Sequence, residues 1–341
     1  MADKPKIKLA QWGTKHGHAA AVLQVMLEND DVEFAGVYEG DAERVATIKS
    51  ESPWSEVTFF SSERDILDDP SIVCVASEGY NSESLDQSEA IIDAGKHLWY
   101  DKPAGDNYAQ WERVIEKARA NDLMVQMGFM FRENWAFAQT AKWAKSGLLG
   151  DIYNVRAHMS TNIPQAAQAV IAVHSGGILY DLGSHMLDQI VWLLGRPNKV
   201  TSFMRREFSD SANFADNTAA IYEFDKAMAI LDIAAVEAKP MARRFEVYGT
   251  NGSAILGPFD PPEYLRLTLN EASGDYAAGI TEFSAHPYRR HVESLVRLIG
   301  TLRGEHAADR TLDHELLVQE TLMRTVGGIN PDGVDTANFS L

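Results

Sequence analysis

The sequence contains 341 residues, of which 45% are hydrophobic and 23% are charged. At about 150 residues per domain this length predicts two domains, and the composition excludes a collagen, a coiled coil or a disordered chain as a description of the whole. The 49 acidic and 31 basic residues leave a formal charge of -18. Because such a chain repels phosphate backbones, we expect no nucleic-acid partner.

The single cysteine, Cys74, excludes an internal disulfide and favours a reducing compartment. It lies in the apolar run 72–76, which indicates a core residue rather than a nucleophile. The charged residues 1–8 lack the apolar stretch of a signal peptide, and no apolar run reaches the roughly 20 residues of a membrane span. We therefore expect a cytoplasmic protein with no membrane partner.

Short apolar runs alternate with helical segments over the first 128 residues. Strands are expected at 7–12, 32–38, 57–60, 72–76, 97–100 and 124–128, and helices at 18–27, 41–49, 84–94 and 108–120. Strands separated by helices predict βαβ units and a parallel sheet, whose buried strands should be continuously apolar, as these are. The fold class predicted for this part is a doubly wound α/β domain.

The pattern changes after about residue 150. Strands are expected at 152–159, 200–206, 218–224, 227–235 and 245–249, and helices at 182–194, 289–303 and 313–325. Turns at 224–227 and 249–252 predict hairpins, and short strands joined by turns imply an antiparallel sheet. The tail 330–341 has little periodicity and is expected to be extended. We therefore predict a second, α+β domain.

The turn after the first strand reads Gln11-Trp12-Gly13-Thr14-Lys15-His16-Gly17-His18. In the dinucleotide fingerprint G-x-G-x-x-G, glycines let backbone amides approach a pyrophosphate. Here Gly13 takes the middle position, and Gln11 and His16 replace the outer glycines. An ordinary strand-to-helix turn is the alternative, but its place before a helix favours phosphate binding. The candidate cofactor contacts are Trp12, Gly13, Thr14, Lys15 and His16.

Several other polar residues bear on the choice of cofactor and on the chemistry. Glu39, about 20 residues past the turn, ends the second strand. A carboxylate at this place accepts hydrogen bonds from a ribose diol and repels a 2′-phosphate. This favours NAD over NADP, although Glu39 could be a solvated acid and Arg44 keeps NADP open. His16 and His18 lack further ligands, so they are expected to be structural and no metal is predicted. Lys102 and Pro103 directly follow a strand, so the Lys102 ammonium is expected at the carboxyl end of the sheet, where ligands bind in open α/β folds. The alternative is that Lys102 is an ordinary solvated lysine.

The segment 176–188 is the strongest constellation. Asp181 and His185 are four residues apart and would share one helix face, with Asp188 one turn further. A histidine near a carboxylate can act as a base with an orienting partner. Two alternatives remain open: Asp181 could cap the helix while His185 lies in the core, or His174 could complete a metal site.

Several motifs together resemble the glucose–fructose oxidoreductase / inositol dehydrogenase (Gfo/Idh/MocA) family over nearly the whole chain. They are the Ala-Gly-Lys strand leading to Lys102-Pro103, the pattern Gly-Gly-x-Leu-x-Asp-x-Gly-x-His-x-x-Asp at 176–188, Trp192-Leu193-x-Gly195, and the segments 128–134, 147–152 and 249–253. The resemblance implies an NAD(P)-binding Rossmann domain at 1–128. It implies a C-terminal α+β domain at 129–341, with a large, open, mostly antiparallel sheet that binds substrate and forms homodimers or homotetramers.

The resemblance also implies a reaction. A hydride passes between the hydroxyl of a sugar, inositol or related polyol and the nicotinamide, with NAD favoured over NADP. The family's catalytic lysine, aspartate and histidine fall on Lys102, Asp181 and His185, which also bind substrate. His185 is expected to be the base, Lys102 to stabilise negative charge, and Asp181 to orient substrate or His185. The remaining pocket candidates are Arg132, Asn134 and Asn162.

The chain departs from the family pattern at the cofactor site. The glutamate before Lys-Pro is Asp101, and the segment T-P-x-x-x-H appears as Ala76-Ser77-Glu78-Gly79-Tyr80-Asn81-Ser82. The family's histidine is thus missing, and Ser77, Glu78, Asn81, Asp101, Lys102 and Arg132 complete the cofactor-binding candidates. These departures keep other functions open: a glycoside-cleaving enzyme of this family that retains NAD, a nucleotide-sensing regulatory protein, and a metal enzyme, for which no stoichiometric metal is expected.

Overall fold

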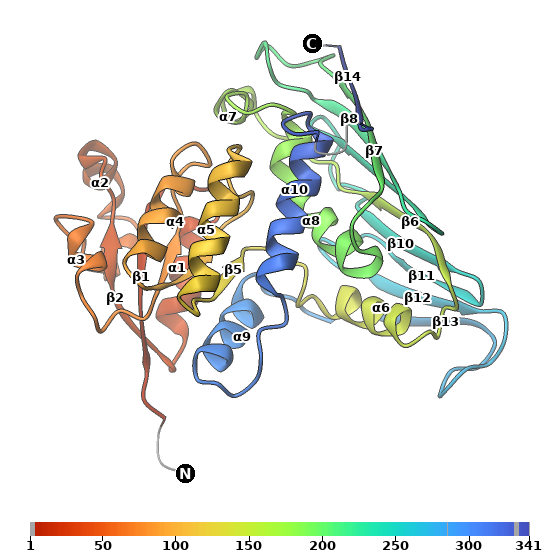
Figure 1. Cartoon of the computed structure of the whole chain (residues 1–341), viewed down its shortest axis with the longest axis horizontal. Helices are drawn as coiled ribbons and strands as arrows, with labels where there is room; N and C mark the ends of the chain where they lie inside the picture. The colour runs from red at the N-terminus through yellow and green to blue at the C-terminus, as the bar shows by residue number, and fades with distance from the viewer. Residues whose placement is uncertain (1–3, 285, 331–333, 341) are drawn as a thin grey trace. The chain divides into compact units, whose positions relative to one another are not determined.

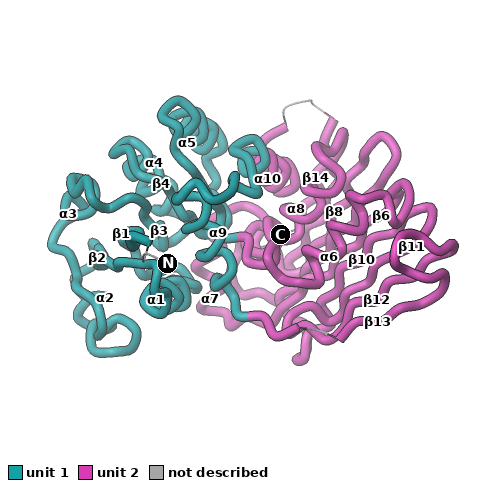
Figure 2. Tube along the Cα trace, turned by 90° about the horizontal axis from the view of Figure 1, so that it is seen from below, with its two compact units in different colours: residues 1–128, 289–316 teal, residues 129–288, 317–341 magenta. Residues whose placement is uncertain are grey.

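The computed structural model describes residues 4–284, 286–330 and 334–340. The chain forms two compact units, coloured separately in Figure 2: unit 1 comprises residues 1–128 and 289–316, and unit 2 comprises residues 129–288 and 317–341. The sequence placed the boundary between 128 and 129 and assigned all later residues to the second domain. The structure groups the segment 289–316 with the first unit instead.

Unit 1 is built on a five-stranded parallel sheet, which confirms the predicted fold class. Its strand order is β2-β1-β3-β4-β5. The strands are β1 (Ile7–Trp12), β2 (Val32–Tyr38), β3 (Cys74–Ser77), β4 (His97–Tyr100) and β5 (Val125–Met127). The strand predicted at 57–60 is wrong, because this segment contributes only an isolated bridge between Val37 and Phe59.

Helices cover this sheet (Figure 1). They are α1 (Ala19–Glu28), α2 (Ala42–Ile48), α3 (Arg64–Leu67), α4 (Ser84–Asp93), α5 (Tyr108–Ala120) and α9 (Val292–Leu302), with a 3-10 turn at Trp54–Glu56. Val22 of α1 and Leu298 of α9 share one core cluster with Leu9 and Cys74 of the sheet, which explains why 289–316 joins unit 1. Cys74 is fully buried, and burial raises the pKa of its thiol to about 12.

Unit 2 is built on a nine-stranded sheet with the order β13-β12-β11-β10-β6-β9-β8-β7-β14. The pairs β6–β9 and β7–β14 are parallel and the other described pairs are antiparallel. The strands are β6 (Ile152–His158), β7 (Lys199–Arg205), β8 (Asn217–Glu223), β9 (Met228–Ala234), β10 (Arg244–Gly249), β11 (Gly252–Leu256), β12 (Tyr264–Leu269), β13 (Gly279–Ser284) and β14 (Thr336–Ser340). The extended tail is thus confirmed for 336–340, whereas 331–333 and 341 lie outside the described residues.

The remaining helices are α6 (Trp135–Lys145), α7 (Gln165–Ile171), α8 (Ile178–Leu194) and α10 (Leu312–Thr325). Helix α8 packs on β8 and β9 (Figure 1). It begins four residues before the predicted helix at 182, because Gly177, with φ +52°, turns the chain into it as the N-cap. Among the described residues, no helix is both long and apolar enough to span a bilayer.

Candidate functional site

The turn between β1 and α1 is fixed by two unusual positions. Gly13 has φ +92°, and a Cβ built there would lie 2.5 Å from the backbone nitrogen of Gly79. The buried side chain of Gln11 donates from Nε2 to the carbonyl oxygens of Gly13 (3.0 Å) and Ala19 (3.3 Å). Gln11, in place of the first glycine, therefore ties together the two ends of the turn, and only glycine fits at position 13.

Glu39 and Arg44 hold the residue that follows Gly13. One carboxylate oxygen of Glu39 accepts from the backbone nitrogen (3.0 Å) and Oγ1 (2.8 Å) of Thr14, and the other accepts from the Asp41 amide (3.0 Å). Arg44 donates to Thr14 Oγ1 and to the Thr14 carbonyl oxygen, both at 2.6 Å. The Arg44 guanidinium, because of which the sequence did not exclude NADP, is thus hydrogen-bonded to this turn.

A cavity of about 340 Å³ lies beside the ends of β1 and β2, and it is lined by Trp12, Lys15, Tyr38, Glu39, Gly40, Asp41, Glu63, Glu83 and Gln87. The Lys15 ammonium is 3.4 Å from Glu83 and 3.9 Å from both Glu39 and Asp41. Four carboxylates against one ammonium disfavour an additional phosphate here.

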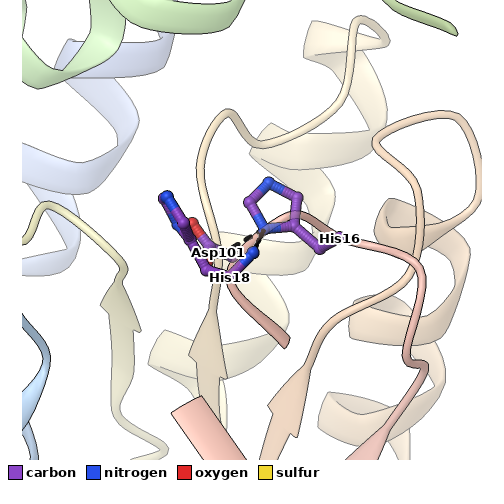
Figure 3. Close-up of side chains that lie close together, drawn as sticks. All are labelled: His16, His18 and Asp101. Atoms are coloured by element: carbon purple, nitrogen blue, oxygen red, sulfur yellow. Dashed lines mark hydrogen bonds and ion pairs between the residues drawn. The ribbon is translucent and has the colours of Figure 1, made fainter. Parts of the chain in front are cut away.

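Two half-buried histidines, His16 and His18, meet the buried carboxylate of Asp101 at the carboxyl edge of the parallel sheet (Figure 3). Asp101 Oδ2 is 3.1 Å from His16 Nδ1 and 2.9 Å from His18 Nδ1, and Glu78 Oε2 is 3.8 Å from His16 Nδ1. Burial opposes ionisation of Asp101, but the two histidines hold its pKa well below the ordinary range. Burial, together with the Asp101 charge, raises the pKa of Glu78.

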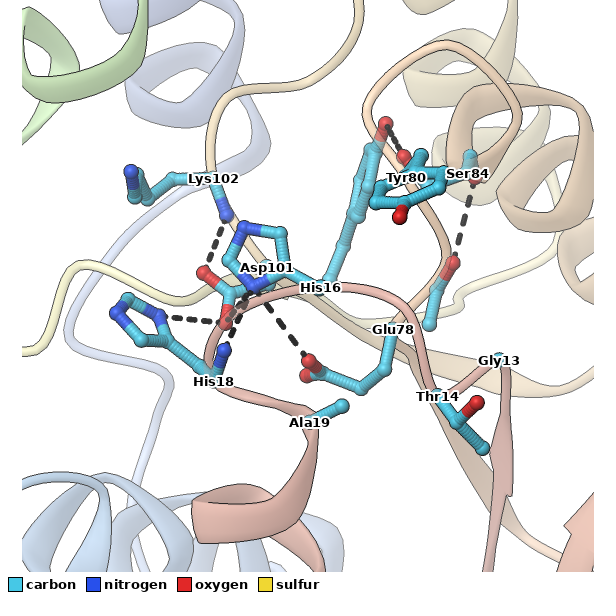
Figure 4. Close-up of polar contacts among 12 residues, drawn as sticks. Gly13, Thr14, His16, His18, Ala19, Glu78, Tyr80, Ser84, Asp101 and Lys102 are labelled. Carbon is cyan, nitrogen blue, oxygen red and sulfur yellow. Dashed lines mark hydrogen bonds and ion pairs between the residues drawn. The ribbon is translucent and has the colours of Figure 1, made fainter. Parts of the chain in front are cut away.

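Other predicted cofactor contacts surround this cluster (Figure 4). Lys102 is buried, and its backbone nitrogen donates to Asp101 Oδ1 at 2.7 Å. Ser77 is also buried, and its hydroxyl donates to the Ser84 carbonyl oxygen at the start of α4 (3.3 Å). Asn81 Oδ1 is buried without a hydrogen-bond partner among the described residues. The structure thus gathers these residues at one edge of unit 1, and their contacts with a cofactor stay predictions.

In unit 2, α8 carries Asp181, His185 and Asp188. His185 is 1% exposed, and its ring lies edge-on to Phe131 with centroids 5.3 Å apart. Asp188 accepts a bidentate pair of hydrogen bonds from Arg132, whose guanidinium also stacks on Trp192 at 3.8 Å. Both members of this ion pair are buried. This pairing explains both side chains structurally, and the cofactor contact expected of Arg132 stays a prediction.

In the 176–188 segment, the structure contradicts a helix cap at Asp181, whereas the buried position of His185 agrees with the core position that was the other part of that alternative. The N-cap of α8 is Gly177 rather than Asp181, and a Cβ there would lie 2.4 Å from the Ala215 backbone. His174 stacks on Tyr180, with centroids 4.5 Å apart. Among the described residues, the potential metal ligands gather around His16, not around His185.

The two predicted asparagines differ in their surroundings. Asn134 caps α6 by accepting from the Ala136 amide at 3.0 Å, and its Nδ2 is buried with no acceptor among the residues that the structure describes. Asn162 is exposed and donates to the Glu237 carbonyl oxygen at 3.2 Å. Asn134 therefore offers an unused donor, whereas the amide of Asn162 already has an acceptor.

Comparison with known proteins defines the class. Residues 12–129 match the model of the oxidoreductase family with an NAD-binding Rossmann fold, and residues 137–255 match the GFO/IDH/MocA C-terminal domain. The chain belongs to the Gfo/Idh/MocA family of oxidoreductases, and unit 1 contains its NAD-binding domain.

Two curated relatives are inositol dehydrogenases of Bacillus subtilis. The scyllo-inositol 2-dehydrogenase (NAD(+)) is 27% identical over 252 residues, covering 72% of this chain and 70% of its own. The scyllo-inositol 2-dehydrogenase (NADP(+)) IolW is 27% identical over 244 residues, covering 70% and 67%. GenD2 from gentamicin A biosynthesis, solved in complex with NAD, has a similar fold, with a TM-score of 0.77, 18% identity and coverage of 97% and 95%.

Proposed function

We propose that this protein is an NAD-dependent dehydrogenase that oxidises a hydroxyl group of an inositol, a sugar or a related polyol. The observation that carries the proposal is the pair of Asp181 and His185, which lie one turn apart on α8 of unit 2, with His185 buried. Its two inositol dehydrogenase relatives, which act with NAD(+) and NADP(+), support the substrate class.

His185 is the proposed base. Its imidazole takes the proton of the reacting hydroxyl while the carbon-bound hydrogen leaves with its electron pair and a carbonyl forms. The Phe131 ring against its edge limits how the imidazole can turn. Asp181 shares the same helix face and orients either the substrate hydroxyls or the imidazole.

Lys102 is the proposed electrostatic partner. It follows β4 at the carboxyl edge of the sheet, where ligands bind in open α/β folds. The hydrogen bond from its backbone nitrogen to Asp101 Oδ1 restrains the local backbone conformation. An ammonium held there stabilises the negative charge that develops on the reacting oxygen.

The nicotinamide, when bound, supplies the hydride acceptor. Gly13 and the turn that it begins would hold the pyrophosphate, and Glu39 with the neighbouring carboxylates would admit a ribose diol. The acid-lined cavity at the end of β2 supports NAD over NADP. The NADP(+)-dependent relative makes this preference a question for measurement.

A homodimer or homotetramer formed through the open sheet is also part of the proposal. Large apolar side chains are exposed on several strands of unit 2: Tyr153, Phe203, Met228, Ile280 and Phe339. Light scattering of the purified protein would report a dimer or tetramer, and a monomer would contradict this part of the proposal.

The roles are tested by replacing Lys102 with Ala and His185 with Asn, with the exposed Lys49→Ala and His306→Ala as matched controls. We expect each site variant to lose about 10²–10⁴-fold in kcat for polyol oxidation while calorimetry still detects NAD binding. Unchanged turnover in either site variant would contradict the assignment. NAD that stays bound through purification, with net glycoside hydrolysis, would favour the glycoside-cleaving enzyme instead. Binding of neither nucleotide would favour the regulatory protein.

A further inference from the structure

We propose that His16, His18 and Asp101 of unit 1 form a binding site for a divalent transition-metal ion of the zinc type, with Glu78 as a fourth ligand (Figure 4). Imidazole and carboxylate groups together suit such an ion. The proposed dehydrogenase reaction needs no metal, so this site goes beyond it. The sequence predicted no metal because two histidines had no third ligand, and the fold supplies one from 83 residues away.

The first argument is geometric. The two Nδ1 atoms lie 3.1 and 2.9 Å from the same Asp101 oxygen, and all three ligand atoms lie within 4.8 Å of one another. Nitrogen and oxygen ligands of zinc sit at about 2.0–2.2 Å, so neighbours in a tetrahedral site are about 3.3 Å apart. Side-chain movements of up to about 1.5 Å, the difference between the 4.8 Å limit and this spacing, would therefore bring the three atoms around one ion.

The second argument concerns His16 Nδ1. This nitrogen accepts the backbone N–H of His18 at 3.2 Å, so it carries a lone pair rather than a proton. The same nitrogen faces Asp101 Oδ2 at 3.1 Å and Glu78 Oε2 at 3.8 Å. Because an imidazole nitrogen has a single lone pair, a bound cation takes it in place of the His18 amide and at the same time pairs with the neighbouring carboxylate oxygens.

The third argument is the buried carboxylate of Glu78. This side chain is 2% exposed, and its Oε2 has no hydrogen-bond partner among the described residues although it points at His16 (Figure 4). Buried polar atoms are almost always partnered, because an unmade hydrogen bond there is costly. Glu78 lies outside the group of three ligand atoms that are within 4.8 Å of one another, but its Oε2 is 3.8 Å from His16 Nδ1, so a side-chain movement would bring it to the ion as a fourth ligand.

The surroundings are built to hold these ligands. The backbone nitrogen of His16 donates to the Glu78 carbonyl oxygen at 2.9 Å, and the Lys102 amide fixes the other oxygen of Asp101. The ring of the buried His291 lies against that of His18, with centroids 5.2 Å apart. Such outer contacts orient metal ligands and stabilise the bound ion.

The test is a calorimetric titration of the full chain, stripped with a chelator, with ZnCl2 in the absence of nucleotide. We expect one equivalent of Zn²⁺ per chain. His16→Ala, His18→Ala and Asp101→Asn should each weaken binding by about 100-fold, and Glu78→Gln by about 10-fold. The exposed His306→Ala is the matched control and should bind like the unchanged protein. Circular dichroism shows that each variant is folded.

A second measurement needs no variant. Co²⁺ added to the stripped protein should give the intense visible bands of a four-coordinate ion, and an excess of Zn²⁺ should abolish them. Weak six-coordinate bands would overturn the proposal. So would an absence of Zn²⁺ binding, or binding that the four substitutions leave unchanged. Because no nucleotide is present, these results are independent of whether the protein is a dehydrogenase.

Discussion

Replacing Gly13 with alanine should damage the β1–α1 turn more than any other single methyl group placed in it. The backbone at Gly13 has φ +92°, a conformation that side chains with a Cβ rarely adopt. The new Cβ would lie 2.5 Å from the nitrogen and 2.8 Å from the Cα of Gly79. Both are backbone atoms, so neither can move aside by a change of rotamer.

The magnitude follows from these two effects. The left-handed backbone costs an alanine about 1–2 kcal/mol, and forced overpacking costs typically about 1–3 kcal/mol. We therefore expect Gly13→Ala to lower the free energy of unfolding by about 2–5 kcal/mol. For a unit of this size the melting temperature should fall by roughly 5–15 °C. NAD affinity should fall as well, because the amides of the turn are displaced.

Gly17 provides the control within the same turn. A Cβ there meets no atom within 4 Å, and its φ is not positive. Differential scanning calorimetry and NAD titration of both variants test the reasoning. Gly17→Ala should resemble the unchanged protein. A Gly13→Ala variant that melts and binds NAD like Gly17→Ala would refute the close approach of the turn to Gly79.

Three further predictions concern charged groups. Arg132→Leu should lower the free energy of unfolding by about 3–5 kcal/mol in urea titrations, because it removes the cation that compensates the buried charge of Asp188. Replacing both Arg132 and Asp188 with apolar residues should recover most of this loss. A hydrogen bond from Arg113 lowers the pKa of Glu89 from 4.5 to about 2, so the stability that Glu89 contributes is present above pH 4.5 and is lost as the pH falls toward 2. Glu89→Gln should therefore reduce the loss of unfolding free energy between pH 4.5 and pH 2. An unchanged loss over this range would count against the pairing of Glu89 with Arg113. Glu39→Gln should raise affinity for NADP relative to NAD by about tenfold in calorimetry, and an unchanged ratio would show that Glu39 does not select the cofactor.

Local patterns sufficed for most of the fold. The bounds of β1, β2, β4 and α5 agree with the sequence expectation, because buried parallel strands are apolar runs and α5 begins at a capping asparagine, Asn107. The segment 57–60 has the same apolar character yet forms only one bridge. Composition alone does not distinguish a strand from an extended segment that packs beside a sheet.

The site was predictable where its residues are close in sequence. Asp181 and His185 share a helix face because they are four residues apart, which any helix guarantees. The approach of Asp101 to His16 and His18 depends on how the strands are ordered in the sheet, which the sequence does not display. The same holds for the pairing of Arg132 with Asp188, 56 residues apart. Contacts of this kind follow from topology rather than from local pattern.

The central claim is that the protein transfers a hydride from a polyol carbon to NAD. The most direct measurement incubates the purified protein with NAD and a panel of inositols and aldoses and follows NADH formation. The best substrate is then used with deuterium on its reacting carbon. We predict deuterium on the reduced nicotinamide and a carbonyl at the labelled carbon. NAD binding without NADH formation from any member of the panel would contradict the proposed dehydrogenase.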